Sequence, residues 1–226
     1  MRKNIWVIIV AAGAGTRFRA KVPKPFVLLK GKTLLSYSLK VFEQSPLVNS
    51  VIVVGHKDYL PRFQQAVKPF RKVSVVVAGG ATRADSVKRG LSALDQDADI
   101  VMVHDAARPF VDQAMIGRLV VALQEHKAAI VAVPVKATIK KVNAKTMIVE
   151  ETPKRDLLWD VQTPQGFHKN TLLKAHAKIK PGTSTGFLTD DAMLVEAMGI
   201  KVKVVMGDYR NIKITTPEDL IMARGL

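Results

Sequence analysis

The 226-residue sequence contains no cysteine, which excludes disulfides and thiolate metal ligands and is typical of a cytoplasmic protein. It also lacks any apolar run of the ~18 residues that a membrane-spanning helix needs. The apolar segment near the start, residues 5–11, leads into a glycine-rich loop without a cleavage-site pattern, so we interpret it as a strand. We therefore expect a cytoplasmic protein with no membrane partner.

Acidic and aromatic residues are both scarce. There are 19 Asp and Glu against 35 Lys and Arg, and the formal net charge of +16 indicates anionic partners. A basic nucleic-acid-binding protein is therefore a remote alternative. The basic residues, however, are spread along the chain without a Lys/Arg tail, and aromatics at 6% offer little surface for stacking bases. We expect small anionic ligands and no nucleic acid.

Short runs rich in Val and Ile alternate with longer segments of helical character. The runs are almost continuously apolar, as strands buried on both faces are. We expect strands at 5–11, 50–55, 73–78, 100–104, 128–134, 200–205 and 211–213, and helices at 33–44, 58–67, 84–94, 113–125 and 217–223. This rhythm predicts one α/β domain over residues 1–226, with a mostly parallel twisted sheet flanked by helices.

Residues 135–156 break the rhythm. Two β-like runs flank the turn "NAK", and the segment is too polar for the interior of a sheet. We expect a protruding β-hairpin arm that packs on the surface or reaches another subunit. Isolated two-stranded hairpins are marginal in water, so burial of this arm against a partner would favour a homodimer.

Loops that follow parallel strands meet at the carboxyl edge of the sheet, where ligands bind. The first, "AAGAGTRFRAKVPK", offers glycine amides and the charges of Arg17 and Lys24 to a phosphate. It matches neither the dinucleotide nor the Walker pattern, because Phe18 replaces the third glycine and no Gly-Lys-Ser/Thr follows. A tight turn with surface charges is the alternative.

The second loop, "AGGATRADSV", places Arg83 and Ser86 around the start of a helix. The free N–H groups of a helix N-terminus favour an anion or a base edge. Ordinary capping of the helix by Thr82 or Asp85 explains the pattern equally well.

The third segment, "VMVHDAARPF", places Asp105 directly after an apolar strand, where a carboxylate would suit Mg²⁺ beside substrate phosphates. The alternative is that Asp105 only pairs with Arg108. A lone His104 at a strand end is more typical of a structural residue than of a catalytic one. The later segment "VQTPQGF" indicates only a turn before a short strand.

Six motifs occur in order along the chain: "AAGAGTR…PK", "GG-x-x-R-x-x-S", "VHDAARPF", "LW-x-x-x-TPQ-x-F", "TDD" and "NIKITTPEDL". Together they resemble the 2-C-methyl-D-erythritol 4-phosphate cytidylyltransferase family over essentially the whole chain. The resemblance implies a Rossmann-like nucleotidyltransferase fold, a homodimer interlocked by its arms, and Mg²⁺ as cofactor. It also implies transfer of CMP from CTP to methylerythritol phosphate in the non-mevalonate isoprenoid pathway.

Ribitol-5-phosphate cytidylyltransferases are the nearest alternative, because they resemble the chain almost as closely. The dipeptide "LW" before "TPQ" and the wording "HDAARPF" favour methylerythritol phosphate.

The resemblance also implies roles for individual residues. The candidate catalytic residues are Arg17 and Lys24, which match a pair that stabilises the transition state, and Arg155 and Lys213, which match residues that position methylerythritol phosphate. The CTP-binding segments match Ala11, Ala12, Gly13, Gly80, Ala81, Arg83 and Ser86. The substrate-binding set matches Asp105, Thr138, Arg155, Thr163 and Lys213, with Asp105 also the candidate metal ligand and Thr138 reaching from the partner's arm.

From the residues alone, Thr138, Arg155 and Lys213 would be a surface hydroxyl and two solvated charges. Two further positions depart from the family's pattern. Ala81 stands where the family usually has Asp, so a side-chain role is lost while a backbone contact to cytosine would survive. Pro25 stands where the family usually has Gln, and we expect a stiffer loop with activity retained.

Overall fold

The structure is a computed structural model that describes residues 3–13, 18, 22–179 and 188–226. A seven-stranded sheet has the order β11-β7-β10-β6-β1-β4-β5, and every strand except β10 runs parallel to the others. Its strands are β1 (Ile5–Ala11), β4 (Ser50–Gly55), β5 (Val73–Ala78), β6 (Ile100–Asp105), β7 (Ala128–Pro134), β10 (Trp159–His168) and β11 (Lys203–Met206). The predicted α/β class with a mostly parallel sheet is confirmed.

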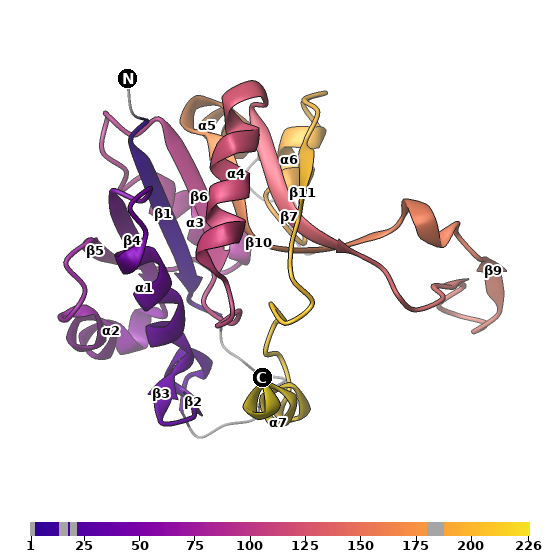
Figure 1. The fold of residues 1–226 in the computed structure, drawn as a ribbon, viewed down its shortest axis with the longest axis horizontal. Coiled ribbons are helices and arrows are strands. Elements are labelled where there is room, and N and C mark those ends of the chain that lie inside the picture. The colour runs from indigo at the N-terminus through magenta and orange to yellow at the C-terminus, as the bar shows by residue number, and fades with distance from the viewer. Residues whose placement is uncertain (1–2, 14–17, 19–21, 180–187) are drawn as a thin grey trace.

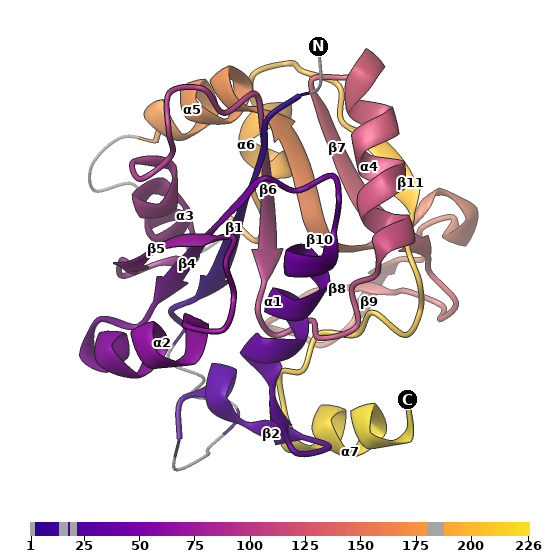
Figure 2. The same ribbon diagram turned by 60° about the vertical axis from the view of Figure 1, so that its left-hand side comes forward.

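Helices cover both faces of this sheet (Figure 1). One buried apolar cluster joins the sheet to α1 (Leu34–Gln44), α2 (Leu60–Val67) and α4 (Gln113–Glu125). The other joins it to α3 (Arg83–Leu91), α5 (Lys169–Ala177) and α6 (Ala192–Glu196). The last helix, α7 (Pro217–Gly225), packs on a two-stranded ribbon of β2 (Leu28–Leu29) and β3 (Lys32–Thr33), below the sheet in Figure 2. Among the described residues, no helix is both long and apolar enough to cross a membrane.

The register of the parallel strands brings their carboxyl ends together. Val10 pairs with Asp105, Ala11 with Gly55, and Gly55 with Ala78. The loops that follow β1, β5 and β6 therefore start at one edge of the sheet, as the sequence predicts.

The segment "VQTPQGF" belongs to β10, so the expectation of a turn before a short strand is wrong. β10 runs antiparallel between β6 and β7, and its pairing shifts between Val161 and Gln165, around a cis Thr163–Pro164 bond. Its buried polar side chains find partners elsewhere in the fold, which an apolar pattern cannot reveal.

The strand expected at 211–213 is also wrong, because the hydrogen bonds of this segment go to other parts of the molecule. Arg108 donates to the carbonyl oxygen of Asn211 at 2.8 Å, and the N–H of Ile214 donates to the carbonyl oxygen of Ala107 at 2.8 Å. The Asn211 side chain is buried and donates to the carbonyl oxygen of Thr163 at 3.0 Å.

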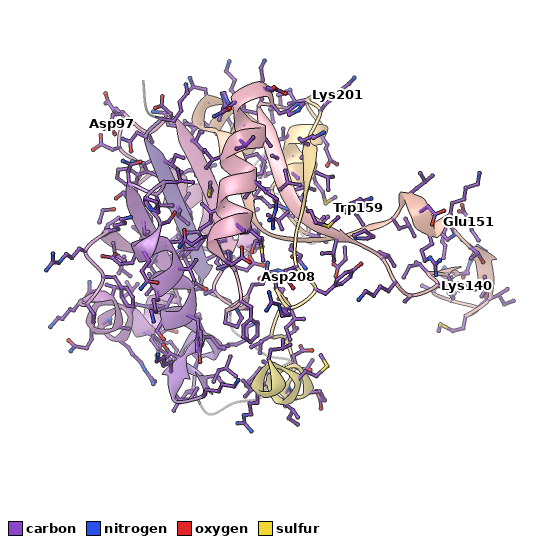
Figure 3. The ribbon with its side chains drawn as sticks, in the orientation of Figure 1. Asp97, Lys140, Glu151, Trp159, Lys201 and Asp208 are labelled. Carbon is purple, nitrogen blue, oxygen red and sulfur yellow. The ribbon has the colours of Figure 1, made fainter. Side chains whose placement is uncertain are left out.

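The predicted hairpin arm projects from the body of the molecule (Figure 1). It contains the short antiparallel pair β8 (Lys141–Val142) and β9 (Val149–Glu151) and the 3₁₀ turn Arg155–Leu157. Figure 3 places Lys140 and Glu151 in the outer part of the arm and Trp159 near its base. Almost every side chain of the arm is exposed in this single chain.

Candidate active site

A cavity of about 690 Å³ opens at the carboxyl edge of the sheet. Its lining includes the ends of β1 and β6, the loop between β5 and α3, and residues from the segment before α7. Many residues that the sequence predicted for the site meet here: Ala11, Ala12, Gly13, Lys24, Gly80, Ala81, Arg83, Ser86, Asp105 and Lys213.

Asp105 at the end of β6 binds two cations. Its Oδ1 accepts a hydrogen bond from Arg83 Nε at 3.1 Å, and its Oδ2 accepts one from Lys213 Nζ at 2.6 Å. Burial by itself raises the pKa of Asp105, but the charges of Arg83 and then Lys213 outweigh burial and hold the pKa below its usual range. The ionised carboxylate therefore fixes both cations at the cavity wall.

The alternative that Asp105 only pairs with Arg108 is wrong. The Arg108 guanidinium donates to the carbonyl oxygens of Asn211, at 2.8 Å, and Val161, at 3.0 Å. Arg108 thus joins the chain after β6 to β10 and to the segment before α7.

A buried hydrogen-bond chain supports Asp105 from behind. Thr163 Oγ1 accepts from the N–H of Asp105 at 3.1 Å and lies 3.0 Å from His104 Nδ1. His104 Nε2 lies 3.2 Å from the Arg108 carbonyl oxygen, which can only accept, so the neutral ring carries its proton on Nε2. The Thr163 hydroxyl then donates to Nδ1. Thr163 and His104 are buried and do not line the cavity; they position Asp105.

Acid should destabilise the fold through His104, because burial lowers the pKa of this ring from 6.5 to about 4. The unfolded chain binds a proton near pH 6.5 that the folded chain does not accept until about pH 4. The free energy of unfolding therefore falls as pH falls through this window. His104→Gln keeps a donor near Arg108, and urea unfolding should show a flatter pH dependence there. An unchanged slope would mean that His104 is not held neutral.

The loop between β5 and α3 lies directly against the end of β1. A Cβ on Gly79 would stand 2.2 Å from the Cβ of Ala12, so this approach requires glycine. The N–H of Gly80 donates to Ser86 Oγ at 3.1 Å, and the Ser86 hydroxyl donates to the Thr82 carbonyl oxygen at 2.9 Å. Ser86 therefore shapes the loop whose backbone lines the cavity.

The capping interpretation of this second loop is confirmed, and binding of an anion or a base edge there stays a prediction. Thr82 and Asp85 form a capping box on α3, since Thr82 Oγ1 accepts from the Asp85 N–H and Asp85 Oδ2 accepts from the Thr82 N–H, both at 3.1 Å. Capping needs no other side chain, so Arg83 in the first turn is left to line the cavity.

From the first loop, Lys24 lines the cavity and belongs to the 3₁₀ turn Lys24–Phe26. Pro25 and Phe26 of the turn are buried, and the Phe26 ring lies 4.7 Å from that of Phe63. The turn is thus anchored by packing, and the stiffer loop expected from Pro25 stays a prediction. Arg17, the other predicted catalytic cation, lies outside the described residues.

The arm residues are not brought to this cavity. Thr138 and Arg155 are exposed on the arm and do not line the cavity of their own chain. Two residues that the sequence analysis missed are Asp191 and His176, which extend the Arg83 ion pair into the core. The motif "TDD" was the only signal for Asp191.

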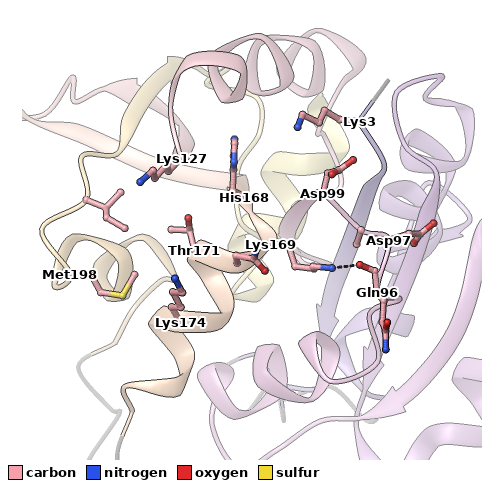
Figure 4. A pocket seen from close by; sticks show the side chains of 13 residues that line it. Lys3, Gln96, Asp97, Asp99, Lys127, His168, Lys169, Thr171, Lys174 and Met198 are labelled. Atoms are coloured by element: carbon pink, nitrogen blue, oxygen red, sulfur yellow. Dashed lines mark hydrogen bonds between the residues drawn. The ribbon is translucent and has the colours of Figure 1, made fainter. Parts of the chain in front are cut away.

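A second cavity, of about 620 Å³, lies at the opposite edge of the sheet (Figure 4). Its lining contains basic residues, among them Lys127 and Lys174, together with Asp97 and Asp99. Within it, Lys169 donates to the Gln96 carbonyl oxygen. Of the residues predicted for the site, none that the structure describes lines this second cavity. The carboxyl-edge cavity is therefore the candidate active site.

A mostly parallel sheet with a basic, glycine-lined cavity at its carboxyl edge is typical of nucleotide-binding α/β proteins. The family model described as 2-C-methyl-D-erythritol 4-phosphate cytidylyltransferase matches residues 5–226. The chain belongs to this family of nucleotidyltransferases.

Individual relatives agree along nearly their whole length. The chain is 46% identical over 220 residues to the 2-C-methyl-D-erythritol 4-phosphate cytidylyltransferase of Alkaliphilus oremlandii, covering 96% of this chain and 92% of that one. Among solved structures, it is similar to the 4-diphosphocytidyl-2C-methyl-D-erythritol synthase of Anaerococcus prevotii, with a TM-score of 0.84, 33% identity, and coverage of 99% and 95%. It is also similar to the 2-C-methyl-D-erythritol 4-phosphate cytidylyltransferase of Francisella tularensis, with a TM-score of 0.83, 34% identity, and coverage of 99% of each chain.

Proposed function

We propose that this chain transfers CMP from CTP to 2-C-methyl-D-erythritol 4-phosphate and releases pyrophosphate. The charge of the cavity carries the proposal. Among the described residues that line it, Asp105 is the only acid, whereas five are Lys or Arg: Lys24, Lys57, Arg83, Arg89 and Lys213. Such a lining suits a triphosphate and a phosphate monoester bound side by side.

The reaction needs no general base. A phosphate monoester has a second pKa of about 6 and is mostly dianionic at pH 7. Its oxygen forms a bond to the α-phosphorus of CTP as the bond from that phosphorus to pyrophosphate breaks. Catalysis then depends on positioning and on stabilising charge. Lys24, together with Arg17, would face the charge that moves onto pyrophosphate, and Lys213, held by Asp105, would orient the incoming phosphate.

The nucleotide would be held by the two loops that meet beside β1. Arg83 supplies a fixed cation, Ser86 shapes the loop, and backbone groups of Ala11, Ala12, Gly13, Gly80 and Ala81 would contact the cytosine ring.

The cavity fits a Mg²⁺ ion that enters with the triphosphate. Among the described residues, Asp105 is the one carboxylate that lines it, and no group of three or more His, Asp or Glu is suited to a metal. Mg²⁺ commonly takes one or two carboxylates and completes its shell with substrate phosphates and water. Asp105 would hold the ion, which would offset the negative charge of the triphosphate.

The arm supports a homodimer with shared active sites. Several large apolar side chains of the arm are exposed: Ile139, Met147, Ile148, Val149 and Leu157. Among the described residues, strand pairing within the arm is limited to β8 and β9 and leaves these side chains exposed, so a partner surface would be needed to bury them. Thr138 and Arg155 would then contact methylerythritol phosphate in the partner's cavity.

Mixing two inactive variants should restore activity. A Lys24→Ala chain keeps an unaltered arm, and an Arg155→Ala chain keeps an unaltered cavity. A mixed dimer therefore contains one site in which both the cavity and the arm are wild type. After subunit exchange, pyrophosphate release should recover to about half of the wild-type rate per mixed dimer, or about a quarter in an equal statistical mixture, if the sites are independent. A mixture that stays inactive despite confirmed exchange would mean that Arg155 acts within its own chain.

The proposed function is tested by measuring pyrophosphate release with CTP, UTP or ATP crossed with methylerythritol phosphate or ribitol 5-phosphate. We expect turnover only with CTP and methylerythritol phosphate. Faster turnover with ribitol 5-phosphate would assign the chain to the related reaction, and no turnover with any pair would overturn the proposal.

A further inference from the structure

Arg83 is held by two carboxylates from distant parts of the chain. Its Nε donates to Asp105 at 3.1 Å, and one terminal nitrogen donates to Asp191 Oδ2 at 2.7 Å. The other terminal nitrogen is buried and has no hydrogen-bond partner among the described residues. Buried donors of this kind call for an explanation, and Arg83 lines the nucleotide cavity.

Asp191 itself is fixed from behind. Its Oδ1 lies 2.9 Å from His176 Nε2 on α5, and both residues are almost fully buried. Its backbone N–H donates to Gln165 Oε1 at 3.3 Å. The carboxylate therefore cannot swing away from Arg83, and the guanidinium plane is set by Asp191 behind the cavity together with Asp105 in the cavity wall.

Keeping a charge at this depth needs a specific reason. Burial by itself raises the pKa of Asp191, but the Arg83 charge and the His176 hydrogen bond outweigh it, so the carboxylate stays ionised. Helix capping does not require the pair, because Thr82 and Asp85 already cap α3.

We propose that Asp191, supported by His176, is a positioning residue that orients the Arg83 guanidinium toward the phosphates of the nucleotide. The proposal rests on the proposed cytidylyl transfer. Asp191 is almost fully buried and does not line the cavity, so its effect on the nucleotide would pass through Arg83.

The test is a double-mutant cycle on the full-length enzyme, with pyrophosphate release as the readout. Asp191→Asn keeps the shape of the side chain and removes its charge. We expect kcat/KM for CTP to fall about 10- to 100-fold, mainly through KM, with KM for methylerythritol phosphate little changed. In an Arg83→Ala background, the same substitution should cost less than about threefold, because the two residues act as a unit. Additive losses, or an equal rise in both KM values, would overturn the proposal.

Asp208→Asn is the matched control. Asp208 pairs with Arg210 at 2.7 Å in a similar way, but on the surface, and neither residue lines the cavity. We expect kcat/KM within about twofold of wild type. An inactive wild-type enzyme would contradict the proposed function, whereas active wild type with normal Asp191→Asn kinetics would contradict only the positioning role.

If Asp191→Asn does not fold, substitutions at His176 test the same proposal. His176→Gln retains an N–H donor for Asp191, and His176→Leu does not. We expect KM for CTP to rise in the Leu variant and to return toward wild type in the Gln variant. Equal KM values for CTP in the two variants would overturn the proposal.

Discussion

Lys24→Ala should lower kcat about 10²- to 10³-fold while raising KM for CTP much less. Loss of one preorganised donor at a position where charge develops typically costs this much in rate. Negative charge moves onto pyrophosphate as the transition state forms, so the Lys24 charge matters more there than in the bound ground state. Steady-state pyrophosphate release at varied CTP measures both constants.

The structure explains why Lys24 suits this role. It lines the cavity from a short turn whose Pro25 and Phe26 are buried, and Arg62 lies 4.3 Å from the centre of the Phe26 ring. The backbone that carries Lys24 is thus fixed before substrate arrives, and its charge need not be reorganised during the reaction.

Lys32→Ala is the control for Lys24→Ala. Lys32 is exposed on β3 and does not line the cavity, so its loss changes the net charge equally without touching the site. Kinetics close to wild type are expected. A Lys24→Ala variant with near-normal kcat and a raised KM for CTP would move Lys24 from catalysis to ground-state binding.

The parallel part of the sheet could be predicted from the sequence because its strands are buried on both faces. All six side chains of β6, for example, are buried, so its apolar pattern is nearly continuous. Parallel strands end together at one edge, and the sequence pattern therefore also predicts that Ala11, Gly80 and Asp105 meet there.

The full extent of β10 could not be predicted, because several of its buried side chains are polar and have structural partners. Gln162 donates to the Asp208 carbonyl oxygen at 2.9 Å, Thr163 binds Asp105 and His104, and Gln165 donates to Asp190 at 2.8 Å. A burial pattern that depends on partners distant in sequence cannot be derived from local hydrophobicity.

The partners of Asp105 could not be predicted for the same reason. Arg108 is only three residues away and is the natural partner by sequence, yet Arg83 and Lys213, which are 22 and 108 residues away, bind the carboxylate. Thr163 was predicted to bind substrate, and its hydroxyl is engaged behind Asp105. We therefore propose that Thr163 influences substrate binding through Asp105.

CTP should be preferred over UTP by about 10⁴-fold or more in kcat/KM, and Gly79→Ala should erode that preference at least tenfold. Cytosine carries an amine and an unprotonated N3 where uracil carries an oxygen and an N–H. A site built to hydrogen-bond one pattern rejects the other by such factors. The added methyl group would meet the Cβ of Ala12 at 2.2 Å and Ser86 Oγ at 2.9 Å, so the two backbone segments must separate.

Gly117→Ala is the matched control for Gly79→Ala. Gly117 lies in α4, and a Cβ built there meets no heavy atom within 4 Å, so the same substitution leaves the site intact. We expect unchanged nucleotide preference and a helix stabilised by roughly 0.5–1 kcal/mol. Thermal melts of both variants separate lost folding from lost selectivity. Comparable turnover of CTP and UTP by the wild-type enzyme would contradict the predicted base preference. Full selectivity in Gly79→Ala would show that base recognition does not depend on the contact between these two loops.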